Sequence, residues 1–119
     1  MQKIFFPSSK PRFINEQEII GELKDIALNL AKKNKNIETV YLFGSFAKGS
    51  AGIHSDADVL VVVSDEHRRM IDRQDEFILE FLEAPVPVDV LVKTRKELSS
   101  ALAEDNRFFV EAVKGIRLV

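Results

Sequence analysis

The sequence predicts a single α/β domain in which a small mixed β-sheet is covered by helices in a two-layer arrangement. Short runs rich in β-branched residues alternate along the chain with longer stretches whose apolar residues recur every three or four positions. One of these runs, residues 57–63, is apolar almost throughout, which is typical of a strand covered on both faces. A chain of 119 residues is long enough for one such domain with its own core.

An irregular segment is expected first, followed by an amphipathic helix. Residues 1–14 include two prolines and show no clear period, so we expect the single folded domain to span residues 15–119. Asn15 and Glu18 have the spacing of a capping box, which starts a helix. Polar residues at 34–36 end it. The predicted apolar face of this helix consists of Ile19, Leu23, Ile26 and Leu30.

The middle of the chain predicts two strands separated by a turn. Residues 38–43 are β-branched and aromatic, which favours a strand. Residues 44–49 predict a turn that leads into a short helix, with Gly49 able to end it. After the strand at 57–63, Ser64 is positioned to cap a long helix reaching about Glu83. The expected inward residues of that helix are Met70, Phe77, Phe81 and Leu82.

The last third of the chain predicts a strand and one more helix. The apolar run 86–92 contains Pro87, which belongs at the start or edge of a strand. Thr94 and Glu97 repeat the capping-box spacing and open the final helix. Residues 116–119 can add a short closing strand. The predicted inner side of the final helix consists of Leu98, Leu102, Phe109 and Val113.

Composition excludes several classes of protein. The net charge of −2 gives no sign of nucleic-acid binding, and no apolar run approaches the roughly 18 residues of a membrane span. The first residues lack the features of a secretory signal. There is no cysteine, and with only two histidines a zinc site would lack nitrogen and sulfur ligands. We therefore expect a cytoplasmic protein without disulfides.

Three aspartates are placed where strands are predicted. Asp56 and Asp58 open the strand at 57–63, and side chains two apart on a strand project to one face. Asp89 lies inside the later apolar run, where a carboxylate is costly to bury unless it is paired or bound to metal. Oxygen ligands of this kind suit Mg²⁺ or Mn²⁺. The alternatives are that the first two aspartates only cap a turn and that Asp89 faces solvent.

A glycine and a serine directly follow the first predicted strand. Gly44 lets the backbone approach a phosphate closely, and Ser45 adds a hydroxyl donor at the start of a short helix. Lys48 is a further candidate for a phosphate contact, and His54, on the loop between the two halves of the pattern, is a candidate to line the same site. A Gly-Ser pair carries little meaning alone. Gly-Ser, ten residues, Asp-x-Asp and a later strand aspartate form a far more specific pattern.

In this pattern the chain resembles the minimal nucleotidyltransferases (the MNT group) of the DNA polymerase beta-like nucleotidyltransferase superfamily. Gly44, Ser45, Asp56, Asp58 and Asp89 fill the positions of the family pattern. The resemblance implies a nucleotidyltransferase fold and two metal ions, Mg²⁺ or alternatively Mn²⁺, held by the three aspartates. It implies that Gly44, Ser45 and Lys48 bind the triphosphate, with ATP as the expected substrate and AMP as the transferred group.

The same resemblance implies a partner. Small chains of this group act as antitoxins of HEPN/MNT toxin–antitoxin pairs, in which the MNT chain adds AMP to a hydroxyl of its helical HEPN partner. Two alternatives stay open: a binding module that neutralises a helical partner without efficient catalysis, and transfer to a small molecule such as an aminoglycoside. Self-association also remains open. Finally, we expect the aromatic rings of Phe46, Phe77, Phe81, Phe108 and Phe109 to belong to the core.

Overall fold

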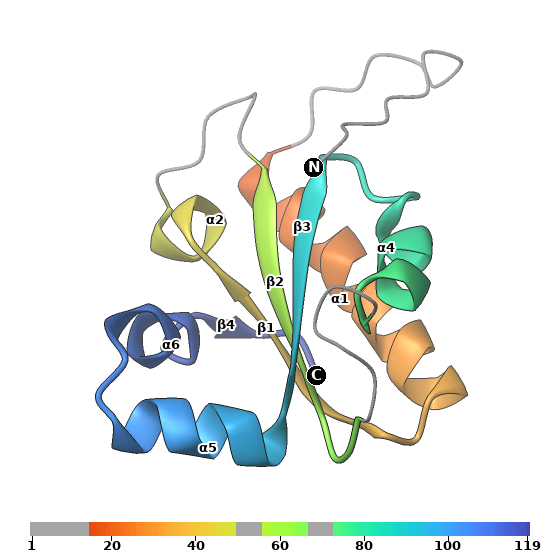
Figure 1. The fold of residues 1–119 in the computed structure, drawn as a ribbon. Coiled ribbons are helices and arrows are strands. Elements are labelled where there is room, and N and C mark those ends of the chain that lie inside the picture. The colour runs from red at the N-terminus through yellow and green to blue at the C-terminus, as the bar shows by residue number, and fades with distance from the viewer. Residues whose placement is uncertain (1–14, 50–55, 67–72) are drawn as a thin grey trace.

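A mixed β-sheet forms the centre of the molecule (Figure 1). The computed structural model describes residues 15–49, 56–66 and 73–119, and within these ranges the sheet has four strands in the order β3-β2-β1-β4. The strands are β1 Ile37–Phe43, β2 Ala57–Val63, β3 Val88–Thr94 and β4 Ile116–Arg117. The helices are α1 Glu16–Lys33, α2 Ser45–Lys48, α4 Asp75–Phe81, α5 Arg95–Ala103 and α6 Arg107–Ala112. The predicted class, a small mixed sheet covered by helices, is confirmed.

The pairing of the strands determines which of their residues are neighbours. β1 runs antiparallel to β2 and β4, whereas β2 and β3 are parallel. In this register Phe43 of β1 lies opposite Asp58 of β2, and Asp58 lies opposite Asp89 of β3. Residues directly opposite each other on paired strands project to the same face of the sheet. One face therefore carries a row of three neighbouring side chains at the end of the sheet.

Helices cover both faces of the sheet (Figure 1). On one face α1 and α4 pack over a core that includes Val59, Val61 and Val63 of β2. On the other face α5 and α6 pack over a smaller core around Leu60 and Val62. Because β2 contributes to both cores, six of its seven residues are buried, which confirms the continuous apolar pattern of this strand. In the described ranges, none of the helices combines the length and apolar character needed to cross a membrane.

Helix α1 begins and ends as its sequence predicts. The side chain of Asn15 accepts a hydrogen bond from the backbone N–H of Glu18 at 2.8 Å, which satisfies one free donor of the first turn. Asn34 ends the helix. The buried residues are Ile19, Leu23, Ala27 and Leu30, while Ile26, predicted on the same face, is only partly buried.

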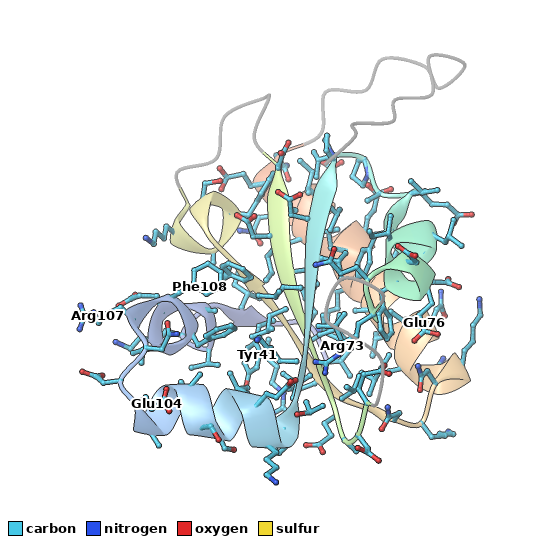
Figure 2. The ribbon with its side chains drawn as sticks, viewed as in Figure 1. Tyr41, Arg73, Glu76, Glu104, Arg107 and Phe108 are labelled. Atoms are coloured by element: carbon cyan, nitrogen blue, oxygen red, sulfur yellow. The ribbon has the colours of Figure 1, made fainter. Side chains whose placement is uncertain are left out.

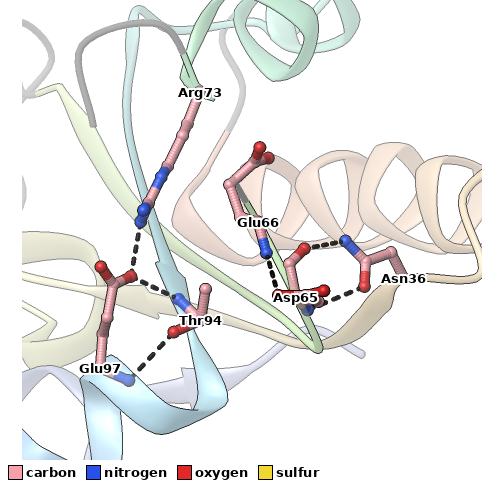
Figure 3. Close-up of polar contacts among 6 residues, drawn as sticks. All are labelled: Asn36, Asp65, Glu66, Arg73, Thr94 and Glu97. Atoms are coloured by element: carbon pink, nitrogen blue, oxygen red, sulfur yellow. Dashed lines mark hydrogen bonds and ion pairs between the residues drawn. The ribbon is translucent and has the colours of Figure 1, made fainter. Parts of the chain in front are cut away.

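The helix predicted from Ser64 does not begin there. Residues 64–66 are not helical, because the chain is tied to the start of β1 by Asn36 (Figure 3). The carbonyl oxygen of Asn36 accepts from the backbone N–H of Ser64 at 2.8 Å. Its side chain amide donates to the carbonyl oxygen of Asp65 at 2.6 Å and accepts from its N–H at 3.0 Å. Helix α4, Asp75–Phe81, has seven residues. Phe77 and Phe81 are buried in it as predicted, and Met70 lies outside the described residues.

The predicted final helix is two helices. Asp105 adopts a positive φ of 57°, which interrupts α5, and the Asn106 side chain then accepts from the N–H of Phe108 to start α6. Asparagine and aspartate visit this backbone region more readily than other residues with a side chain. Leu98 and Phe109 are both buried, but on separate helices. The apolar spacing was compatible with one helix because α5 and α6 pack on the same face of the sheet.

A buried arginine fixes the corner between β3 and α5 (Figure 3). Thr94 and Glu97 form the predicted capping box: the Thr94 hydroxyl accepts from the Glu97 N–H at 3.0 Å, and the Glu97 carboxylate accepts from the Thr94 N–H at 2.9 Å. The same carboxylate also accepts a hydrogen bond from the guanidinium of Arg73, a residue that is only 7% exposed. The hydrogen bond from Arg73 is the main reason that the pKa of Glu97 falls to about 2.

Glu97→Ala is expected to lower the free energy of unfolding by about 1–3 kcal/mol at pH 7, because the change removes a helix cap and one partner of a buried guanidinium. Since the folded-state pKa of Glu97 lies below its ordinary 4.5, this stabilisation is present above that value and is lost as the pH falls toward 2. Urea unfolding between pH 7 and pH 3 measures both effects. The control is Glu38→Ala, which breaks the exposed ion pair with Arg95 and should leave stability nearly unchanged. An equal loss in both variants would contradict the assignment.

Candidate functional site

Three carboxylates gather at the end of the sheet where β2 and β3 begin. These strands are parallel, so their first residues lie at one edge, and the register places Asp58 directly beside Asp89. Asp56 immediately precedes β2. The next backbone N–H, that of Ala57, donates to the carbonyl oxygen of Pro87 at 2.9 Å and joins the two strand starts. The predicted convergence of Asp56 and Asp58 thus includes Asp89, which is brought in by strand pairing.

The charges of these carboxylates act on one another. The pKa of Asp58 is raised above its ordinary value, first by burial and then by the negative charges of Asp89 and Asp56. Burial and like charges both disfavour the ionised form of a carboxyl group. At neutral pH the site therefore concentrates negative charge at an energetic cost that a bound cation would relieve.

Gly44 brings the backbone into contact with the central carboxylate. Its φ is +77° and its ψ is −148°, a combination that is almost confined to glycine. A Cβ added at Gly44 would overlap Oδ2 of Asp58 and would lie 3.3 Å from its Cγ. Thus the turn after β1 passes directly against Asp58, and only a residue without a side chain fits there.

The remaining residues predicted for phosphate binding follow Gly44 in α2. Ser45 is the first residue of this short helix and is half-buried. Lys48 is the last residue of α2 and is exposed. Gly49 ends the helix, as predicted, and has the left-handed conformation. Phe46 is buried at 3% exposure, also as predicted. His54 lies outside the described residues.

The aspartates fit a divalent cation in donor chemistry. All three offer carboxylate oxygens, the ligands that Mg²⁺ and Mn²⁺ prefer. As placed within residues 15–49, 56–66 and 73–119, however, no group of three or more His, Cys, Asp or Glu side chains encloses a metal position. The charge and the donor type of the three aspartates fit such an ion, whereas the positions of their side chains in this structure do not surround one.

An aromatic pair that the sequence does not place near the site lies on the other side of Asp58. Phe43 lies opposite Asp58 on β1, and its ring meets that of Phe108 edge to face, with centroids 5.5 Å apart. Figure 2 shows Phe108 on α6. The expectation that Phe108 belongs to the core is wrong, because this residue is 53% exposed. Its neighbour Phe109 is buried, and adjacent residues on a helix point about 100° apart, which was the available signal.

Comparison with known proteins decides the family. Residues 22–114, which include all of the predicted site residues, match the family described as the nucleotidyltransferase domain. The chain belongs to the nucleotidyltransferase family. This match covers well over half of the 119 residues and confirms the family that the Gly-Ser and aspartate pattern predicts.

Relatives of this nucleotidyltransferase domain share part of its sequence and its fold. A protein of Methanocaldococcus jannaschii named "putative protein adenylyltransferase" is 31% identical over 72 residues, which are 56% of this chain and 49% of the relative. The matched region thus spans about half the length of that relative. A crystal structure of a "putative nucleotidyltransferase" from Sulfolobus solfataricus is 29% identical and has a TM-score of 0.54, covering 66% of this chain and 70% of the other. A toxin–antitoxin structure with AMP-PNP is 19% identical, with a TM-score of 0.44 and coverage of 76% and 82%.

Proposed function

We propose that this nucleotidyltransferase moves AMP from ATP to a hydroxyl group of a partner protein. The observation that carries the proposal is the contact of the Gly44 turn with Asp58, which in turn lies beside Asp89. In this arrangement the backbone at Gly44 can approach a phosphate closely, and the carboxylates beside it can bind a cation. A protein acceptor is supported by the name of the Methanocaldococcus jannaschii relative.

Each residue has a proposed role. Asp56 and Asp58 would hold two divalent ions, Mg²⁺ or alternatively Mn²⁺, and Asp89 would complete the ligand set on the side of the acceptor. Such ions neutralise the triphosphate and stabilise the leaving pyrophosphate. Gly44 and Ser45 would hold the terminal phosphates, with Lys48 at the end of α2 as a further contact.

The proposed reaction is an in-line displacement at the α-phosphorus of ATP. A new bond forms between the acceptor oxygen and the α-phosphorus, while the bond from that phosphorus to the bridging oxygen breaks and pyrophosphate leaves. Asp89 would help to take the proton of the attacking hydroxyl. Since Asp58 lies between the Gly44 turn and Asp89, the phosphates and the acceptor would meet from its two sides.

The proposed partner is a helical protein of the HEPN type, with this chain as the antitoxin of the pair. The resemblance of the Gly44, Ser45, Asp56, Asp58 and Asp89 pattern to the MNT group supports this choice.

Incubation with α-labelled ATP, Mg²⁺ and the protein encoded beside this chain tests the proposal. We expect label to appear on the neighbouring protein and to depend on the divalent ion. Tight association without label would favour a binding module that neutralises its partner. Label found only on a small molecule, such as an aminoglycoside added to the mixture, would instead favour small-molecule transfer.

A further inference from the structure

The exposed ring of Phe108 is linked to the central carboxylate, Asp58, through Phe43. Asp58 is paired with Phe43 across β1 and β2, and the Phe43 ring touches the Phe108 ring. Phe43 also directly precedes Gly44, whose turn touches Asp58. The aromatic pair is therefore joined to the proposed phosphate site through both the strand register and the chain itself.

Two contacts hold this ring in a defined orientation. Phe108 meets Phe43 edge to face at 5.5 Å and Phe109 edge to face at 5.0 Å. Phe109 is buried in the core and also packs beneath the amino group of Lys93, 5.3 Å from its ring centroid. A ring that is fixed by its neighbours and still 53% exposed is preorganised to contact a flat ligand.

The aromatic pair and the proposed acceptor lie on different sides of Asp58. In the row across the sheet, Phe43 and Asp89 lie on opposite sides of Asp58. The proposed acceptor hydroxyl approaches at Asp89, so Phe43 and Phe108 lie on the side away from the acceptor, next to the turn proposed for the phosphates. A planar ring on that side can stack on the nucleobase, and aromatic side chains are common stacking partners of bases.

The surroundings of Phe108 argue against a docking surface for a protein. Among the described residues, the other exposed large hydrophobic side chains are Leu28 and Leu79, which lie on α1 and α4. These helices cover the opposite face of the sheet from α6. Phe108 touches the partly buried Phe43 and the buried Phe109, and among the described residues no other exposed large hydrophobic side chain lies on its face of the sheet. One exposed ring is smaller than the contiguous patch that marks a protein interface.

We propose that Phe108, seated on Phe43, stacks on the nucleobase of the bound nucleotide, an inference that rests on the proposed function. Stacking uses the π-face that every base possesses, so this contact adds affinity without selecting one base. ATP and GTP should therefore depend on Phe108 to a similar degree. Inorganic tripolyphosphate, which has the phosphates but no base, should not depend on it.

The test compares Phe108→Ala with the unchanged protein by calorimetry in Mg²⁺. We expect the Kd for ATP and for GTP to rise roughly tenfold, the size of effect seen when a base loses its aromatic partner, and the Kd for tripolyphosphate to stay the same. Phe108→Tyr keeps the ring and should bind like the unchanged protein. Leu79→Ala is the matched control, since it truncates an exposed apolar side chain on α4.

The possible outcomes separate this inference from the proposed function. If the unchanged protein binds ATP and Phe108→Ala binds it equally well, the stacking role is wrong while the nucleotide site stands. Equal weakening of ATP and tripolyphosphate would also overturn it, since the base would then be irrelevant. Loss of partner association with intact ATP binding would assign Phe108 to a protein interface. Failure of the unchanged protein to bind either probe would overturn the proposed function and this inference together.

Discussion

Replacing Asp58 with asparagine is expected to lower nucleotidyl transfer by at least about a hundredfold, the size of effect that follows loss of a preorganised group at a reacting phosphate or acyl centre. Asparagine keeps the shape of the side chain but removes the charge that would hold the cation between Asp56 and Asp89. The rate of label transfer from ATP at saturating Mg²⁺ measures this loss. Unchanged Mg²⁺-dependent transfer in Asp58→Asn would contradict the proposed catalytic site.

The same substitution is expected to raise the melting temperature of the metal-free protein. The pKa of Asp58 is raised by burial, by Asp89 and by Asp56, so the folded state disfavours its charge. This penalty is absent at low pH, develops as the pH rises above the ordinary pKa of aspartate, and is complete at pH 7. Mn²⁺ or Mg²⁺ should raise the melting temperature of the unchanged protein more than that of Asp58→Asn.

Asp25→Asn is the matched control for both measurements. Asp25 is an exposed residue of α1, and α1 packs on the face of the sheet opposite α5 and α6. The change removes one negative charge without touching the carboxylates at the start of β2. Transfer rate and response to Mn²⁺ should remain those of the unchanged protein. A similar response in Asp25→Asn and Asp58→Asn would mean that total charge, and not the site, controls cation binding.

Gly44→Ala is expected to abolish nucleotide binding and to destabilise the fold by about 1–3 kcal/mol, because a side chain at this φ and ψ is strained. The new Cβ would also overlap Oδ2 of Asp58, so either the turn or the carboxylate must move. Calorimetry with tripolyphosphate reports the phosphate contacts, and urea unfolding reports stability.

Gly49→Ala separates backbone strain from damage to the site. Gly49 also has a positive φ, +72°, but no atom of the described residues lies within 4 Å of the Cβ that alanine would add. This variant should lose stability through strain and keep its affinity for tripolyphosphate. Equal affinity in Gly44→Ala and the unchanged protein would show that the close approach to Asp58 is not needed for binding phosphate.

Local signals in the sequence predicted much of this fold because local interactions determine the features concerned. Asn15, Thr94 and Glu97 cap helices through residues three positions away, and the apolar run of β2 reflects burial on both faces. The helix predicted from Ser64 does not begin there, because the N–H of Ser64 and both backbone groups of Asp65 are hydrogen-bonded to Asn36, 28 positions before Ser64. A capping pattern compares residues three positions apart, so it cannot reveal hydrogen bonds to so distant a residue.

The candidate site was predictable in its residues but not in its surroundings. Asp56, Asp58 and Asp89 stood out because acids are unusual beside apolar strands. The pairing of Asp58 with both Phe43 and Asp89 depends on strand order, which the spacing of motifs does not encode. For the same reason Phe108, which is distant in sequence and lies on α6 where one continuous helix was predicted, could not be placed near the site.

The position of β2 inside the sheet is expected to protect this strand from local opening. β2 has a hydrogen-bonded strand on each side and a hydrophobic core on each face. Interior strands of this kind exchange their amide hydrogens through opening of the whole domain, whereas edges and short helices open locally. Fraying of the two-residue β4 or of α6 would thus leave Asp58 in place. We therefore expect that local opening of α6 would remove the proposed contact of Phe108 with the base while Asp58 keeps its position on β2.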